Sequence, residues 1–361
     1  MPFAGDFEKF SDGASHLVST DRSLRDSSEY FERKIIESFL SKLEAGIDIP
    51  NYPQFRDMNK MFFEMMDGIE RLKGGYVETG VISQRSSKAE IPEVLALRRN
   101  SKEIYERTGG TFRVKICITG PYTLSSFFRY RDPEIYGRLG DALSKIADGN
   151  MFDDKHGGVR ILAVDEPVFG SKDDPQMDVG SAGRENLLQS WEGICRKARQ
   201  KGVETCFHLH STTDELVWQV DSLGIVESHV GDPLYSTEST KRLLESTDKM
   251  LKASICITIF DKLIEKHVLS RSKDIEKMDI TGKIGQVWEE IREGKTVPDT
   301  FIEDAETMER RLREIVGRFG SERVPYAGSE CGLRSFPTYE CAVECLRRAS
   351  TATKVFDRQP P

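Results

Sequence analysis

The sequence predicts an α/β protein built as one (β/α)8 barrel, and two observations support this fold class. Short apolar runs alternate with longer, charged amphipathic stretches along the 361 residues, which is the rhythm of repeated strand–helix units. Reactive side chains follow several of these runs, and in a barrel the ends of all strands meet on one face. With 38% hydrophobic residues, we expect a single barrel domain over residues 1–361.

Six apolar runs are the clearest candidates for strands. They cover residues 112–119, 159–164, 203–209, 223–226, 250–257 and 323–327. Between them, apolar residues spaced three and four apart predict helices over 186–200, 237–246 and 304–319. The sequence contains neither a Gly-rich dinucleotide fingerprint nor a P-loop, which favours the barrel over a doubly wound sheet.

Two regions depart from the strand–helix repeat. The first hundred residues contain helical patterns, strongest over 28–45 and 58–72, which we expect to form extra N-terminal helices outside or beneath the barrel. Residues 260–303 are much longer than an ordinary strand-to-helix loop. Their charged sequence, interrupted by Gly and Pro, predicts a helical insertion over the active-site face.

Composition and charge exclude several classes of partner. The formal net charge of -8 would repel nucleic acid and anionic lipid. The longest apolar run falls well short of the ~20 residues of a membrane span, and the first residues lack the features of an export signal. Seven scattered cysteines favour a reducing compartment over a disulfide framework. We therefore expect a cytoplasmic protein whose partners are small molecules or proteins.

Four residues at predicted strand ends have the chemistry of a metal site. His208 and His210 lie two residues apart on a strand, so their imidazoles point to the same side. Glu227 and Cys331 follow two later apolar runs. Together these groups are ligands that Zn²⁺ selects, although alone a Glu here is more often solvated and a Cys more often a small core residue. His229 fits either a partner of these ligands or, preferentially, a surface loop residue.

Five short motifs, in order, resemble the catalytic barrel of cobalamin-independent methionine synthase. They are ICITGPYTL (116–124), AVDEPVF (163–169), FHLHS (207–211), the strand end at Glu227 and SECGLRSFP (329–337). The resemblance implies a cytoplasmic zinc methyltransferase of methionine biosynthesis that activates a small thiol, homocysteine or a related one, as methyl acceptor. The chain is similar to a short, one-barrel branch, which implies a methylated corrinoid protein as the methyl donor.

The family's metal ligands are a His-x-Cys pair, a Glu and a second Cys. By resemblance they match His208, His210, Glu227 and Cys331, which would be both the metal ligands and the catalytic residues. His210 departs from the family pattern, which has Cys at that position. The substitution removes one negative charge from the predicted site.

The resemblance also implies substrate-binding residues. Asp165 matches the residue that binds the amino group of homocysteine, and Ser19 is a weakly aligned match for a carboxylate-binding serine. Gln54 stands where the family has a second, acidic ligand of the amino group. The family's catalytic His after the seventh strand has no counterpart, because Ile-Thr-Ile-Phe occupies residues 257–260.

The sequence leaves two other functions open. One is a zinc-dependent lyase or hydrolase that uses activated water, a chemistry that suits a His-rich ligand set. The other is a catalytically degenerate binding protein, which the missing His and altered amino-group site would permit. Tightly held zinc would argue against degeneracy, and a metal spectrum that responds to thiols would argue against water chemistry.

Overall fold

The computed structural model describes residues 1–17, 25–86, 90–271 and 279–358. These residues form a mixed α/β fold around a curved parallel sheet of six strands, in which each strand pairs with the next in the chain. The strands are β3 (Phe112–Thr119), β4 (Gly157–Glu166), β5 (Glu204–Leu209), β6 (Ile225–Glu227), β7 (Met250–Cys256) and β8 (Tyr326–Ser329). All six strands predicted from the apolar runs are present.

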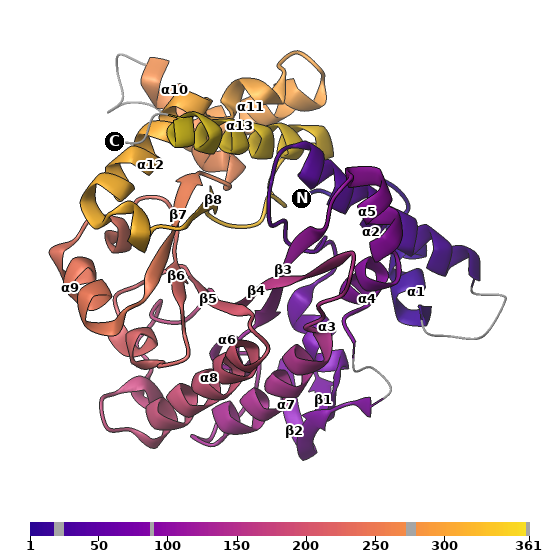
Figure 1. Cartoon of the computed structure of the whole chain (residues 1–361), viewed down its shortest axis with the longest axis vertical. Coiled ribbons are helices and arrows are strands. Elements are labelled where there is room, and N and C mark those ends of the chain that lie inside the picture. The colour runs from indigo at the N-terminus through magenta and orange to yellow at the C-terminus, as the bar shows by residue number, and fades with distance from the viewer. Residues whose placement is uncertain (18–24, 87–89, 272–278, 359–361) are drawn as a thin grey trace.

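Helices between and after these strands cover the sheet. They are α6 (Pro121–Ser125), α7 (Ile135–Asn150), α8 (Ala182–Gln200), α9 (Glu238–Thr247), α12 (Ala305–Phe319) and α13 (Tyr339–Arg358), with short turns η3 (Pro175–Met177), η4 (Glu215–Gln219), η5 (Pro233–Tyr235) and η8 (Ser321–Arg323). Figure 1 shows the strands curling around the centre with α7, α8, α9 and α12 outside them. The predicted helices over 186–200, 237–246 and 304–319 correspond to α8, α9 and α12.

The closed, eight-stranded barrel expected from the sequence is not seen in the described residues, which form a curled half-barrel. Asn51 makes an isolated parallel bridge to Lys115 at the free edge of β3. Around it, Tyr52 N donates to Lys115 O, and Lys115 N donates to Pro50 O. Pro50 has no N–H to donate to the next carbonyl of β3, so the pairing cannot extend in that direction into a regular strand.

The N-terminal third adds helices and a hairpin. Its helices are α1 (Phe7–His16), α2 (Arg25–Glu44), α3 (Met58–Glu64), α4 (Pro92–Arg99) and α5 (Ser101–Thr108). The helix predicted over 28–45 is confirmed by α2, but the one over 58–72 is half wrong. After α3 the chain forms β1 (Met66–Leu72), antiparallel to β2 (Gly75–Gln84). Gly68, Gly74 and Gly75 have positive φ values, which a continuous helix does not allow.

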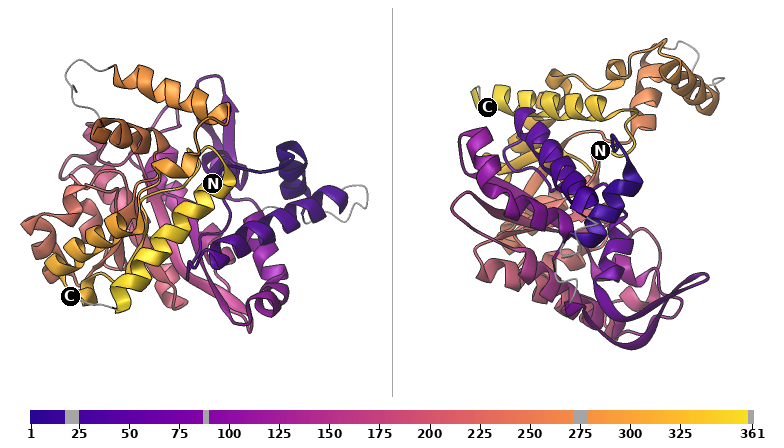
Figure 2. Two further views of the ribbon diagram at one scale, coloured as in Figure 1. Left: turned by 90° about the horizontal axis from the view of Figure 1, so that it is seen from above. Right: turned by 90° about the vertical axis from the view of Figure 1, so that its right-hand side faces the viewer.

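The insertion predicted over 260–303 is helical where it is described. It forms α10 (Phe260–Arg271), α11 (Ile280–Arg292) and the short turn η7 (Pro298–Phe301). Trp288 Nε1 on α11 donates to Asp261 Oδ1 on α10, at 2.7 Å. Figure 2 shows both helices, in orange, at the edge of the molecule. Their placement over the active-site face stays a prediction. Within the part of the chain that is described, no helix is long and apolar enough to cross a membrane.

Candidate metal centre

One row of side chains crosses the sheet near the carboxyl ends of its strands. The strand register pairs Thr119 with Asp165, Asp165 with His208, and His208 with Glu227. Residues at the same register level of neighbouring strands lie side by side on one face. The sheet therefore brings Asp165, His208 and Glu227 together, as expected from their places at predicted strand ends.

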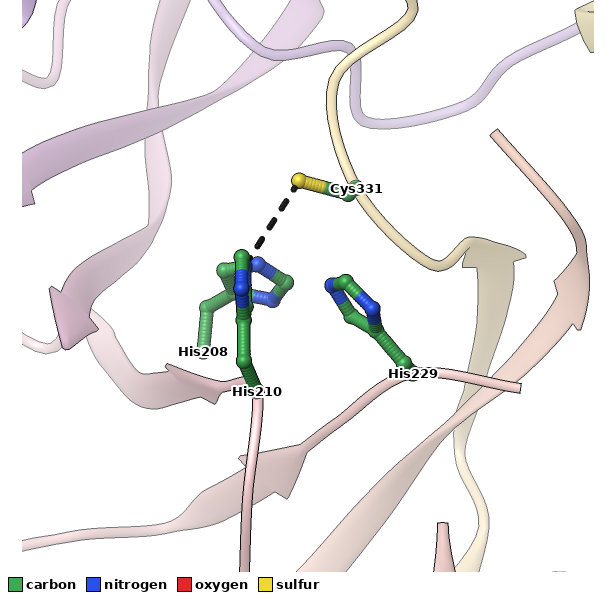
Figure 3. Close-up of side chains that lie close together, drawn as sticks. All are labelled: His208, His210, His229 and Cys331. Carbon is green, nitrogen blue, oxygen red and sulfur yellow. Dashed lines mark hydrogen bonds between the residues drawn. The ribbon is translucent and has the colours of Figure 1, made fainter. Parts of the chain in front are cut away.

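Four side chains next to this row could hold a metal ion. One ligand atom from each of His208, His210, His229 and Cys331 lies within 4.8 Å of the others. The Sγ of Cys331 and the Nε2 of His210 are 3.9 Å apart, and Figure 3 shows the three imidazoles and this sulfur around a common space. His208 is buried and His210 is exposed, so the cluster is open to solvent on one side.

Two histidine nitrogens support a metal in this cluster. Among the described residues, Nε2 of His208 and Nε2 of His229 are buried without a hydrogen-bond partner. Buried polar atoms are rarely left unpaired because their desolvation is not repaid. A ligand bond would satisfy both nitrogens, and three imidazoles with one thiolate form a donor set typical of Zn²⁺. The residues present therefore fit the metal predicted from the sequence.

Charge interactions within the cluster favour a thiolate. Although burial raises the pKa of the Cys331 thiol, the neighbouring imidazoles of His208, His210 and His229 outweigh it and bring this pKa down to about 3. Burial lowers the pKa of His208, but Cys331 and Glu227 raise it to about 10. Both shifts favour the charged forms, a thiolate at Cys331 and an imidazolium at His208. A thiolate is the form that binds metals.

Glu227 is adjacent to the cluster but contacts other groups. Its Oε1 lies 3.4 Å from Nζ of Lys115 and 3.4 Å from Nδ1 of His208, and its Oε2 contacts Nζ of Lys252. Burial raises the pKa of Glu227, but the two lysines hold it well below its usual range. Glu227 is not in the group of possible ligands found among the described residues, whereas His229 is.

The two lysines that contact Glu227 can be recognised in the sequence. Lys115 and Lys252 each interrupt an apolar strand, FRVKICIT and MLKASIC, and a lysine inside such a run requires a buried anion. Glu227 is the anion that these lysines contact, and this pairing makes the nearby His229 a candidate ligand and not only a surface loop residue. If Glu227 pairs with the lysines, His229 is the nearby residue that can serve as the fourth ligand.

The three predicted substrate-binding residues differ in placement. Asp165 is half-buried beside His208, and burial raises its carboxyl pKa to about 6 against the opposing effect of His208 and Lys115. The amide of Gln54 instead lies 2.9 Å from Sδ of Met58. Ser19 lies outside the described residues. The substrate-binding roles of all three remain predictions.

The fold and the cluster define an α/β protein with a candidate metal centre at the carboxyl end of a curled parallel sheet. Its fold is similar to that of a B12-independent methionine synthase from Shewanella sp. W3-18-1 in complex with selenomethionine, with a TM-score of 0.59, 15% identity and coverage of 94% of this chain and 90% of the other. The fold is also similar to that of a methyltransferase from Methanosarcina mazei, with a TM-score of 0.54 and 12% identity. This second match covers 90% of this chain and 86% of the other. At these identities the likeness concerns the fold.

Sequence comparison points to the same group of proteins. A 5-methyltetrahydropteroyltriglutamate–homocysteine methyltransferase from Coxiella burnetii (strain Dugway 5J108-111) is 24% identical over 229 residues, which is 61% of this chain. The match covers 28% of that relative, so the chain spans only part of the length of the curated relatives it matches. No protein-family model matches the sequence. These comparisons do not support the corrinoid partner expected from the sequence, since the methionine synthase that this chain resembles in fold is named as B12-independent.

Proposed function

We propose that this protein is a zinc-dependent methyltransferase with a small thiol, homocysteine or a related one, as methyl acceptor. The observation that carries the proposal is the convergence of His208, His210, His229 and Cys331 within 4.8 Å. The similarity to a homocysteine methyltransferase supports this reaction class. A single barrel is the matching proposal for the fold, with the bridge between Asn51 and Lys115 in place of a further regular strand beside β3.

The residues divide into metal ligands and substrate-orienting groups. When bound, zinc would lower the pKa of the acceptor thiol from about 8.5, so that it reacts as a thiolate at neutral pH. His210 lies on the exposed side of the cluster, where the acceptor thiol would enter, either in place of His210 or as a fifth ligand. Asp165, next to His208 in the row, would bind a cationic amino group and hold the sulfur toward the donor. Such orientation can contribute several kcal/mol to catalysis.

The methyl donor has two candidates. The curated relative's name refers to a 5-methyltetrahydropteroyltriglutamate, while the sequence resemblance to a one-barrel branch implies a methylated corrinoid protein. Since this chain spans 28% of that relative, the relative's donor is a proposal for this chain and no more. The assay should therefore include both donors.

The test is methyl transfer by the zinc-loaded protein. Homocysteine, cysteine and 2-mercaptoethanol would each be incubated with methylcobalamin or a 5-methyltetrahydropteroyl triglutamate, and the thioether quantified. We expect one thiol to be methylated, and Cys331→Ser to reduce zinc content and rate together. Stoichiometric zinc without methyl transfer from either donor would contradict the proposal. Ester hydrolysis or a lyase reaction under those conditions would favour water chemistry.

A further inference from the structure

We propose that Glu227 positions a metal ligand instead of binding the metal, that Lys115 and Lys252 hold it in this role, and that His229 is the fourth ligand. This inference rests on the proposed function only for the presence of zinc. It departs from the ligand set that the sequence resemblance implies, in which Glu227 binds the metal.

Glu227 fixes which nitrogen of His208 faces the metal. Its Oε1 lies 3.4 Å from His208 Nδ1, so the Nδ1–H is directed to the carboxylate. The other nitrogen, Nε2, is buried and has no hydrogen-bond partner in the described chain. A carboxylate that accepts from one imidazole nitrogen leaves the second as a ligand and makes it more basic. Glu227 therefore orients the imidazole of His208 from the Nδ1 side, opposite the nitrogen that would bind the metal.

Two lysines lie against the two oxygens of Glu227, although Oε2 meets Lys252 Nζ as an ion-pair contact and has no hydrogen-bond partner among the described residues. Lys115 reaches Glu227 from β3, although β4 and β5 lie between β3 and β6 in the sheet. This contact must therefore cross the concave side of the sheet. Lys252 on β7 contacts the other oxygen and also donates to Ser329 O at 2.8 Å. It thereby connects Glu227 to the strand that leads to Cys331.

The positive charges of the two poorly exposed lysines favour keeping the Glu227 carboxylate beside them. The side chains of Lys115 and Lys252 are 13% and 14% exposed, so neither ammonium is well hydrated. If Glu227 turned to the metal, both would lose their carboxylate partner beside a dication. Removing one partner from a buried ion pair is strongly unfavourable. The pair of lysines thus opposes coordination by Glu227.

His229 supplies the ligand that Glu227 does not. Its ring centroid lies 4.0 Å from that of His210 and 5.8 Å from that of His208. Its Nε2 is buried without a partner among the described residues. Figure 3 shows the His229 ring turned toward the space between the other two imidazoles and Cys331. The geometry gives zinc three imidazoles and one thiolate.

X-ray absorption of the zinc-loaded full chain tests this ligand set, together with zinc affinity from chelator competition. We expect three imidazoles and one sulfur in the parent protein. Glu227→Gln should keep this ligand set but weaken zinc binding about 10- to 100-fold, the usual effect of losing such a partner. His229→Ala, the matched control, should lose one imidazole from the spectrum.

The parent spectrum decides the question even if Glu227→Gln fails to fold. Two imidazoles with one carboxylate oxygen, or no zinc bound, would overturn the inference, as would a ligand set altered by Glu227→Gln. A Lys115→Met/Lys252→Met variant gives a second test, because we expect Glu227 then to enter the ligand set. A three-imidazole spectrum without methyl transfer would contradict the proposed function alone, and active methyl transfer with a bound carboxylate would contradict this inference alone.

Discussion

Glu166 is a fully buried carboxylate that follows Asp165, and it accepts four hydrogen bonds. Oε1 accepts from Tyr122 N at 3.0 Å and Trp191 Nε1 at 2.8 Å, while Oε2 accepts from N and Oγ1 of Thr123, both at 2.7 Å. Burial raises the pKa of Glu166 to about 7, although these donors pull it down. Glu166 thus fixes the end of β4 to the first turn of α6.

Glu166→Gln should destabilise the protein by about 2–4 kcal/mol, because an amide NH2 cannot accept and leaves two buried donors unpaired. Urea denaturation at pH 8 measures the effect. Glu185→Gln is the control, since Glu185 is exposed on α8 and should change stability by less than about 0.5 kcal/mol. Equal effects of the two changes would refute this account of Glu166.

His210 is the residue at which the sequence differs from the His-x-Cys pattern of the methionine synthases that it resembles. His210→Cys would add a negative charge to the ligand set, so we expect a higher thiol pKa and a more nucleophilic sulfur in the bound acceptor. The thiol pKa and the reactivity of the sulfur can both be obtained from the pH dependence of the rate of methyl transfer. An unchanged thiol pKa together with an unchanged rate would show that the His at this position has no such effect.

At the residue scale, the sequence identifies three members of the cluster, His208, His210 and Cys331. It does so because a position at a strand end and a spacing of two residues determine the direction in which the side chains point. It misses His229, and it cannot assign Glu227 to its lysines. The contact between Glu227 and Lys115 crosses the concave side of the sheet, and neither spacing nor strand order predicts such a contact.

Glu303 connects three elements beside the sheet. It accepts from Ile257 N at the end of β7 at 3.1 Å, from Lys266 Nζ on α10 at 2.7 Å, and from Arg311 Nη2 on α12 at 2.8 Å. Burial raises the pKa of Glu303, but Arg311 and Lys266 reverse this and lower it. The network holds the helical insertion against the last part of the sheet.

The pKa of Glu303 predicts an acid-sensitive stabilisation. Because the folded-state pKa lies below the unfolded value of about 4.3, the stabilisation is present above that pH and is lost as pH falls through the folded pKa. At pH 7, Glu303→Gln should cost about 2–3 kcal/mol, and this difference should shrink toward pH 3 in urea denaturation. The control is Glu306→Gln, at an exposed position on α12. A difference independent of pH would contradict the prediction.

The hairpin of β1 and β2 depends on Gly68. Its φ is +79°, and a Cβ there would lie 2.3 Å from the carbonyl oxygen of Val81. Gly68→Ala should therefore destabilise by about 1–3 kcal/mol. Gly285→Ala is the matched control, because that helical glycine on α11 has nothing within 4 Å and should gain up to about 1 kcal/mol. Thermal melts that rank the two variants in the opposite order would contradict this.

Element prediction succeeds where burial on both faces gives a continuous apolar run, as in residues 116–119 of β3. It fails at residues 66–72, where the apolar spacing suits a helix. The glycines there decide the outcome, since Gly68 and Gly74 adopt positive φ values of 79° and 92°. A helix stops at such residues, and the chain turns back as a hairpin.

At the scale of the whole molecule, the sequence predicts strand order and the side of the sheet that carries the site. The number of strands depends on the segment at Asn51, which pairs with β3 through one bridge and is preceded by Pro50, a residue that cannot donate to β3. Closure of a barrel is a property of such edge pairings, which apolar runs do not report. The four residues of the cluster come from β5, β6 and β8 with the loops that follow them.

The central claim is that the cluster holds a metal to which a thiol substrate binds. Titration of the cobalt-substituted protein with homocysteine, followed by visible absorption, tests it most directly. We predict a saturable spectral change that depends on Cys331 and is absent in Cys331→Ser. A cobalt spectrum that no thiol alters while the metal stays bound would contradict the claim.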